Sequence, residues 1–243
     1  MNIVKPEQTV YAKCLIYAPM GHGKTRFCGT AQLDERTKPS LFLDFEGGAL
    51  TLSGLDIDTV RIRSRSDFLD VYDEIRNNTD KYKSISIDSI SEVEFGDLID
   101  IIDSAKERRP EKDHDLIQQG DYGKGHVRLQ RLVRQFRDLP YHIFVTAGSQ
   151  DVLEARVGIV KKPQLTGKMA DQIPAVMDVV GYLGIREENG QAKRALMLQG
   201  FSDLRVKVRL PWDTHDVPDQ IEEPTVGKLL DALHYGARVN AKR

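Results

Sequence analysis

The sequence predicts an α/β domain with a mostly parallel central β-sheet flanked by helices. Short, almost continuously apolar runs such as LFLDF (41–45) and HIFVTA (142–147) are typical of strands covered on both faces. Longer segments with helical periodicity separate these runs, which favours right-handed crossovers and therefore parallel strands. A glycine-containing loop with a Lys-Thr pair also follows the first predicted strand, an arrangement typical of phosphate-binding α/β proteins.

The strands are placed by their apolar runs and by the residues that end them. The parallel strands are expected at Tyr11–Tyr17, Leu41–Phe45, Thr59–Arg63, Ser84–Asp88 and His142–Ala147. Two further strands flank the turn EENGQ and predict an antiparallel hairpin at the sheet edge, at Val176–Ile185 and Ala192–Leu198. The intervening stretch 148–169 has no strong periodicity, so no regular element is expected there.

The helices are placed by apolar residues that recur on one face. They are expected at Lys24–Leu33, Asp67–Asn77, Ser91–Ala105, Tyr122–Leu139 and Thr225–Leu233. Ser66 is expected to cap the second of these helices. In the fourth, the expected apolar positions include Val127, Leu129 and Phe136. No internal repeat or linker divides the chain, which predicts one domain.

The segment from Ala18 to Thr25 fits the phosphate-binding pattern G-x-x-x-x-G-K-[ST], with Ala in the first position. Its glycines let successive backbone N–H groups point at phosphate oxygens, and the positive end of the following helix strengthens that field. Lys24 is expected to reach the β- and γ-phosphates, and the Thr25 hydroxyl to ligate Mg²⁺. The residues assigned to nucleotide binding here are Met20, Gly21, His22, Gly23, Lys24, Thr25 and Arg26. The alternative is a chance glycine-rich turn.

Acidic residues end two of the predicted parallel strands, where ligands bind in open α/β sheets. Asp88 is expected to hold Mg²⁺, directly or through water, and the alternative is a cap for the next helix. Glu46 is expected to activate the attacking water as a catalytic base, and the alternative is a solvated turn. Asp44 lies on the same strand face as Glu46, so it is expected either to support the groups around the metal or to bind a metal-bound water as a second metal-site candidate.

The end of the fifth predicted strand supplies polar candidates for sensing the γ-phosphate. Thr146, Ser149 and Gln150 lie there, and the nucleotide-site assignment includes Thr146 and Gln150. Polar residues are also ordinary at strand ends, so sequence alone leaves both interpretations open.

Composition restricts the class of protein. The net charge of −2 excludes a globally basic nucleic-acid binder, although a local basic groove remains compatible with it. Cys14 and Cys28, the two cysteines, flank the phosphate loop and indicate neither a disulfide framework nor a zinc site. The first ten residues lack the apolar core of a signal peptide, and no apolar run approaches the length of a membrane span. A cytosolic protein with no membrane partner is therefore expected.

The order of these motifs resembles the RecA-like ATPase core. The matching segments are the phosphate loop, LFLDFEGGAL, LDIDTVRIR, SISIDSI and HIFVTAGSQ. More narrowly, the chain resembles phage-encoded RecA-like P-loop ATPases described as AAA or nucleotide-binding proteins, some of which are grouped with single-strand annealing proteins. The segments DYGKGHVRLQRL, PQLTGKMADQIP and MDVVGYL carry this narrower resemblance. It covers about 11–211, although the lead-in is shorter than the subunit-linking element of full-length recombinases.

The resemblance implies a division of the chain and a set of partners. Residues 1–9 are expected to form a flexible lead-in, 10–211 the RecA-like core, and 212–243 a C-terminal loop and helix packed on it. The loop after the fifth strand is expected to contact single-stranded DNA through Arg156, Lys161 and Lys162, and the alternative is a solvated surface loop. Lys168 is a candidate catalytic cation that reaches a neighbouring subunit's γ-phosphate, or else a DNA contact. The resemblance also implies self-association as a ring or filament.

Three functions follow as hypotheses. The first is a Mg²⁺-dependent ATPase that binds single-stranded DNA in phage recombination or annealing. This hypothesis places the protein in the cytoplasm of a bacterial host, with a phage single-strand-binding or replication protein as a further partner. The second is an ATP-gated loader or scaffold for such a partner. The third is a nucleotide kinase, which ranks last because the sequence offers no compact Arg-rich lid around the nucleotide site.

Overall fold

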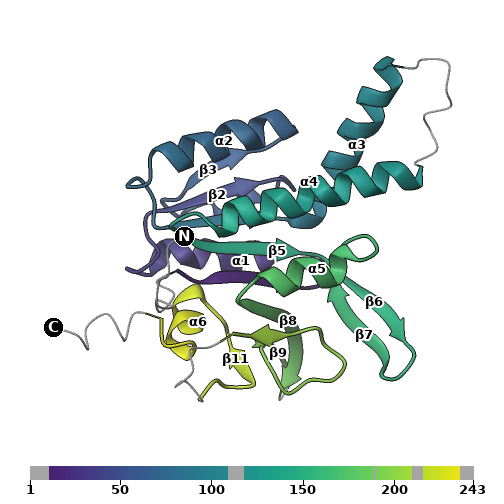
Figure 1. Ribbon diagram of the computed structural model, residues 1–243. Coiled ribbons are helices and arrows are strands. Elements are labelled where there is room, and N and C mark those ends of the chain that lie inside the picture. The colour runs from purple at the N-terminus through teal and green to yellow at the C-terminus, as the bar shows by residue number, and fades with distance from the viewer. Residues whose placement is uncertain (1–10, 109–117, 189, 210–215, 236–243) are drawn as a thin grey trace, which may run out of the picture.

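The computed structural model describes residues 11–108, 118–188, 190–209 and 216–235. Figure 1 shows a central sheet with helices packed on its faces. The expected lead-in at 1–9 lies outside the described residues, as do parts of the expected C-terminal segment at 212–243.

The central sheet is mostly parallel, as the sequence predicts. Within the described residues it has nine strands, in the order β11-β9-β8-β1-β5-β4-β2-β3, with β10 pairing with β8. The six from β8 to β3 run parallel to their neighbours, whereas β9, β10 and β11 are antiparallel. The strands are β1 (Lys13–Tyr17), β2 (Ser40–Asp44), β3 (Asp58–Arg61), β4 (Ser84–Asp88), β5 (His142–Ala147), β8 (Val179–Glu188), β9 (Gln191–Met197), β10 (Lys207–Val208) and β11 (Gln220–Glu222). The expected hairpin is β8–β9, and β11 adds one further strand outside it.

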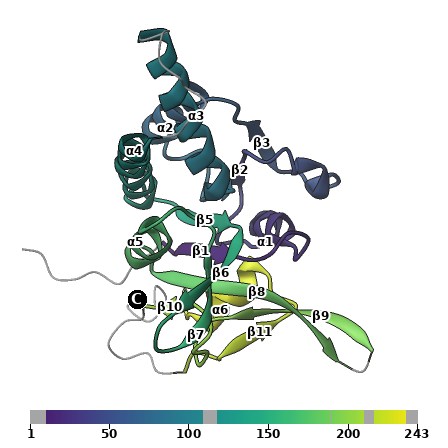
Figure 2. The ribbon, with the colours of Figure 1, turned by 90° about the vertical axis from the view of Figure 1, so that its right-hand side faces the viewer.

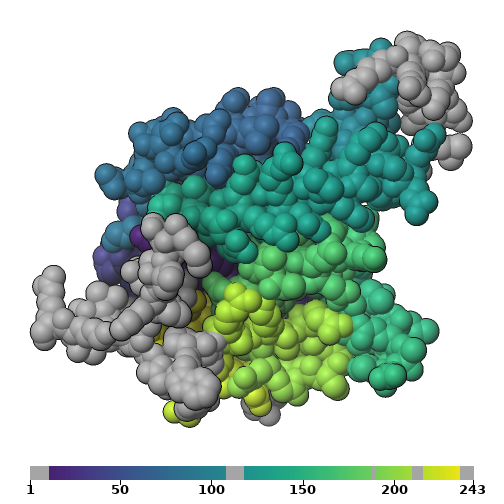
Figure 3. Space-filling model, in the orientation of Figure 1, coloured from purple at the N-terminus to yellow at the C-terminus, as the bar shows by residue number. Residues whose placement is uncertain are grey.

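The helices bury both faces of the sheet. One face packs against α2 (Arg65–Asn77), α3 (Ile90–Arg108), α4 (Gln119–Arg137) and α5 (Met169–Val176). The other packs against α1 (Lys24–Gly29) and α6 (Val226–Ala232). Because successive strand residues point to opposite faces, Leu15 joins the first core and Ile16 the second. In Figure 3, α2, α4 and α5 follow one another across the first face, where Phe68 and Phe136 stack with ring centroids 4.8 Å apart.

Three details of the expected helices are wrong. Ser64, not Ser66, caps α2, because its side chain accepts from the N–H of Asp67 in a reciprocal capping box. The expected first helix ends at Gly29 and continues as a 3₁₀ turn (Thr30–Leu33). Val127, which is expected to share the apolar positions of α4 with Leu129 and Phe136, is 60% exposed and does not belong to the buried face of this helix.

The stretch without periodicity is ordered. It forms a two-stranded antiparallel hairpin of β6 (Ser149–Glu154) and β7 (Gly158–Pro163), followed by α5. Gly158, with φ of 92°, allows the chain to reverse between the strands. Both hairpin faces carry charged as well as apolar residues, so no amphipathic alternation marks these strands in the sequence.

Candidate nucleotide-binding site

The phosphate loop connects β1 to α1 at the carboxyl edge of the sheet. Gly21 and Gly23 have φ of 79° and 97°, the left-handed region that glycine adopts without strain. The loop begins where the Ala18 N–H donates to the Ala147 carbonyl at 3.2 Å. Lys24 is folded over the loop, with its Nζ 3.4 Å from the Ala18 carbonyl oxygen. The ammonium group therefore lies inside the concave side that the sequence assigns to phosphate.

Asp88 is fixed between two threonines at the end of β4. The Thr25 hydroxyl donates to its Oδ2 at 2.6 Å, and the Thr146 hydroxyl donates to its Oδ1. Burial raises the pKa of the Asp88 carboxyl above its usual range, and the two threonine hydrogen bonds oppose that shift. Thr146 is fully buried behind Asp88. The expected contact of Thr146 with the nucleotide is therefore not supported, since its hydroxyl orients Asp88 instead.

Glu46 lies in the turn after β2, where it lines the cavity beside the phosphate loop. Asp44 Oδ1 accepts hydrogen bonds from the N–H groups of Gly47 at 2.7 Å and Gly48 at 3.1 Å. Arg61 holds the same carboxylate in an ion pair at 3.1 Å. Asp44 is thus occupied as the anchor of this turn, which argues against its expected role as a metal ligand. Glu46 itself is exposed, and its N–H lies 3.4 Å from the Asp88 carbonyl oxygen.

The residues present fit a magnesium ion that a nucleotide brings with it. The hydroxyl of Thr25 and the carboxylate of Asp88 are both oxygen donors that Mg²⁺ accepts, and their atoms already adjoin. No group of three or more His, Cys, Asp or Glu side chains in the described part of the chain forms a self-sufficient metal site. This donor set is typical of Mg²⁺, which keeps several waters and takes its other ligands from phosphates.

A cavity of about 1380 Å³ extends from the phosphate loop to the β6–β7 hairpin. Its lining includes Lys24 and Glu46 of the nucleotide site, and Gln150 and Thr166 of the hairpin and the segment that follows it. The Gln150 side-chain amide donates to the carbonyls of Pro163 and Leu165, at 3.0 and 2.9 Å. The side-chain nitrogen of Gln150 is thus occupied at the base of the hairpin. Only its amide oxygen is left for the expected contact with the γ-phosphate.

The cations predicted in the hairpin differ in whether a carboxylate already pairs with them. Lys162 is buried between Glu154 and Asp171, with ion-pair distances of 2.8 and 2.9 Å. Lys161 pairs with Asp151 across the hairpin at 2.9 Å. The expected contact of Lys162 with DNA is not supported, because burial and two carboxylates already satisfy its charge.

Two of the predicted cations remain on the surface. Arg156 lies in the turn that joins β6 to β7, and Lys168 lies directly before α5. Both are exposed, and neither side chain forms an ion pair within the described residues. They are therefore the two predicted cations whose charge is available to a ligand or a second subunit.

A buried acid anchors the segment that presents Lys168, and sequence reasoning missed it. Glu94 of α3 accepts from both the N–H and the hydroxyl of Thr166, each at 2.8 Å. His126 of α4 lies 2.9 Å from the same hydroxyl. Glu94 lies outside the segments that carry the resemblance, whereas His126 and Thr166 lie in two of them. The three residues are far apart in the sequence, so no local pattern indicates that they meet.

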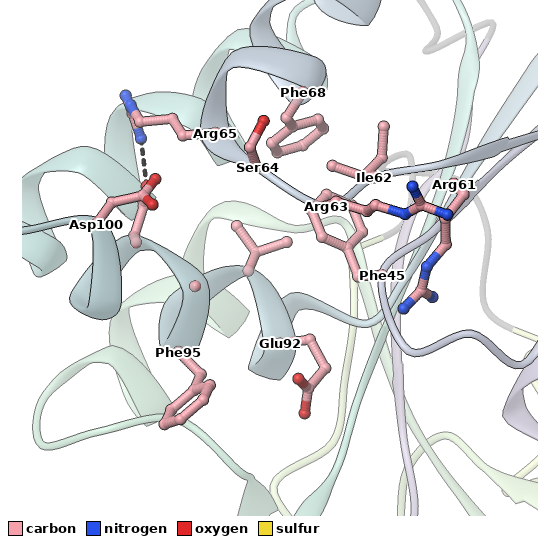
Figure 4. Close-up of a pocket in the computed structure, with 13 residues that line it drawn as sticks. Phe45, Arg61, Ile62, Arg63, Ser64, Arg65, Phe68, Glu92, Phe95 and Asp100 are labelled. Carbon is pink, nitrogen blue, oxygen red and sulfur yellow. Dashed lines mark hydrogen bonds and ion pairs between the residues drawn. The ribbon is translucent and has the colours of Figure 1, made fainter. Parts of the chain in front are cut away.

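A second cavity, of about 250 Å³, lies between β3, α2 and α3. Figure 4 shows the side chains of Arg61, Arg63 and Arg65 around it, together with the ring of Phe68. Arg65 forms an ion pair with Asp97 of α3 at 2.6 Å. This cavity adjoins the larger one, and its Arg61 is the residue that holds Asp44.

The family model described as "AAA domain" matches residues 11–210. The chain belongs to this family. Together with the Lys24, Thr25 and Asp88 geometry, membership identifies a P-loop ATPase. No curated protein matches the chain. No helix in the described ranges has the length and hydropathy needed to cross a membrane.

Two solved structures are similar to the chain at low sequence identity. The flagellar accessory protein FlaH of Methanocaldococcus jannaschii is 13% identical, with a TM-score of 0.51, over 90% of this chain and 88% of that one. A KaiC-like protein of Pyrococcus horikoshii is 15% identical, with a TM-score of 0.47, over 85% of this chain and 93% of that one. The likeness to FlaH supports the fold alone, and the predicted RecA-like α/β architecture is confirmed.

Proposed function

We infer that the protein is a Mg²⁺-dependent ATP hydrolase that couples its nucleotide to single-stranded DNA in phage recombination or annealing. The observation that carries the catalytic part is the convergence of Lys24, Glu46 and the hydrogen-bonded pair Thr25–Asp88 at one sheet edge. These are the side chains that phosphoanhydride hydrolysis needs: a cation for the phosphates, donors for Mg²⁺ and a base for water.

Each residue has a role set by its position. Lys24, already folded over the loop, stabilises charge on the β- and γ-phosphates. Thr25 and Asp88 hold Mg²⁺, which when bound neutralises phosphate charge. Glu46 accepts the proton of the attacking water, and the Asp44–Arg61 pair keeps the Glu46 turn in place.

A single serine links this edge to the hairpin. The Ser91 hydroxyl, in the first turn of α3, donates to the Gln164 carbonyl at 2.8 Å and accepts from the Gly148 N–H at 3.1 Å. The Ser91 hydroxyl therefore connects the residue that follows β5 to the residue that follows β7. In our proposal a change at Asp88 or Glu46 reaches the β6–β7 hairpin through this contact.

Arg156 and Lys168 are the proposed contacts with the DNA backbone, with Lys161 a weaker one because Asp151 offsets its charge. Backbone cations bind phosphates without regard to sequence and lose affinity as salt rises. Lys168 has a second proposed role, on the nucleotide of a neighbouring subunit in a ring or filament. The proposal further includes single-stranded DNA as the partner and the cytoplasm of a bacterial host as the location.

The test is the ATPase rate with and without single-stranded DNA, for wild type, Lys24→Ala and Glu46→Gln. We expect both variants to lose hydrolysis, Glu46→Gln to keep nucleotide binding, and DNA to raise the wild-type rate and the particle size in light scattering. A wild-type rate and particle size that DNA leaves unchanged would contradict the DNA part. Hydrolysis that survives in Lys24→Ala would contradict the catalytic part.

One observation favours the ATP-gated scaffold as a second candidate. The outer half of the hairpin exposes Leu153, Val157 and Ile159, at 81%, 50% and 61%, which is unusual for a surface that binds only a charged backbone. An apolar tip fits a protein partner better. Glu46→Gln discriminates, because a nucleotide-gated scaffold keeps its biological function in this variant whereas a hydrolysis-driven machine loses it.

A further inference from the structure

The β8–β9 hairpin extends beyond the sheet edge that carries the phosphate loop. β8 pairs with β1 only as far as Tyr182, opposite Tyr17. Beyond that point the hairpin continues to the pair Glu188 and Gln191, with no contribution from β1. Figure 2 shows this overhang extending past β11. Arg194, opposite Ile185, lies within it.

The side chain of Arg194 packs on the phosphate loop. A Cβ on Gly23 would lie 3.0 Å from Arg194 Nε and 3.4 Å from its Cδ, so the stem of the arginine occupies the space over this glycine. The strand behind it is fixed, because Arg194 N–H donates to Glu223 Oε1 at 2.9 Å and the Arg194 carbonyl accepts from Glu223 N–H at 2.8 Å.

One nitrogen of the Arg194 guanidinium, Nε, lacks an acceptor. This atom is shielded from solvent, and no described residue accepts a hydrogen bond from it. A buried N–H without a partner is unfavourable, and a charged one more so. A phosphate oxygen in the adjacent loop would satisfy it, and guanidinium is the side-chain group that best matches phosphate geometry.

The strand order indicates which phosphate of the nucleotide lies next to Arg194. Asp88 on β4 and Glu46 after β2 lie on one side of β1, whereas Arg194 on β9 lies on the other. Hydrolysis requires the γ-phosphate to face Glu46. The opposite flank of the loop therefore receives the α-phosphate end of the nucleotide.

We propose that Arg194 is a nucleotide-binding residue that contacts the α-phosphate from the β8–β9 overhang. This inference rests on the proposed nucleotide site and adds a residue to it. Because ADP and ATP share the α-phosphate, Arg194 sets the affinity for both nucleotides and does not distinguish between them.

The experiment is calorimetric titration of the full chain with Mg²⁺-ADP and with a non-hydrolysable Mg²⁺-ATP analogue. We expect Arg194→Ala to weaken both by about tenfold or more, the range for a hydrogen bond to a charged group. Arg194→Lys should weaken both by less. Arg194→Gln keeps most of the stem over Gly23 and removes the charge, so it serves if the alanine variant does not fold.

The matched control is Arg186→Ala, on the same hairpin. Arg186 is exposed and lies over the ring of Phe201 at 5.7 Å, so its removal should leave both affinities unchanged. Unchanged affinities in Arg194→Ala, or a loss confined to the ATP analogue, would overturn the inference. A wild-type chain that binds neither nucleotide would instead overturn the proposed ATPase itself, so the two failures are distinct.

Discussion

Thr146→Val tests whether the buried carboxylate of Asp88 depends on its threonine partners. Valine has nearly the shape of threonine and lacks the hydroxyl that donates to Asp88 Oδ1. Thr146 is fully buried, so no water replaces the lost donor. A hydrogen bond to a charged acceptor contributes about 1.5–3 kcal/mol, and we expect the free energy of unfolding of the nucleotide-free chain to fall by about that amount at neutral pH.

The loss should depend on pH. Burial holds the folded-state pKa of Asp88 above its unfolded value near 3.8, so between these two values the folded chain binds more protons. Stability therefore falls as pH rises through this window. Removing the Thr146 hydrogen bond raises the folded-state pKa further, so the difference between variant and wild type is largest at high pH and shrinks as Asp88 becomes protonated.

The assay is urea unfolding of wild type and Thr146→Val at several pH values from about 8 down to about 4, close to the unfolded-state pKa of Asp88. Thr37→Val is the matched control: Thr37 is also fully buried, but its hydroxyl donates to the carbonyls of Ala31 and Asp34, which do not titrate. We expect a loss of about 0.5–1.5 kcal/mol there, independent of pH. An equal, pH-independent loss in both variants would refute the reasoning.

Three further predictions follow from other residues. Asp44→Ala should lower the ATPase rate by about 10²-fold while leaving the nucleotide Kd nearly unchanged, because it frees the turn that holds Glu46; parallel losses in rate and affinity would contradict this. Thr25→Ala should abolish the excess affinity of ADP with Mg²⁺ over ADP with EDTA in calorimetry, and an excess that persists would remove Thr25 from the metal site. Burial lowers the pKa of His142 to about 4 from an unfolded value near 6.5, so the unfolded chain binds the extra proton and stability should fall by about 3 kcal/mol as pH drops from 6.5 to 4. In urea unfolding, His142→Phe should lose this part of the pH dependence, and an unaltered profile would exclude His142 as its source.

The sequence was sufficient for the parts of the site whose geometry is local. Gly21, Gly23, Lys24 and Thr25 lie within one turn between a strand and a helix, and their spacing alone defines a phosphate loop. Asp88 was also predictable, because an acid at the end of a buried parallel strand must reach the same edge.

Other roles depended on partners distant in the chain. Lys162 looked like an exposed cation, but Glu154 and Asp171 enclose it once the hairpin packs against α5. Thr146 lies at the end of β5, as expected. Its hydroxyl donates to Asp88 on the neighbouring strand, and its side chain does not line the cavity beside the phosphate loop. The β6–β7 hairpin itself was missed because its ion pairs interrupt the apolar alternation that marks a strand.

The sequence by itself determined the α/β class, the phosphate loop and the acids at the strand ends. Each of these follows from short-range periodicity and from the direction of parallel strands. The tertiary structure decided which charges are available and which are paired, and it brought Arg194 from β9 onto Gly23. Side-chain pairing across the sheet depends on register and burial, which no local pattern of residues encodes.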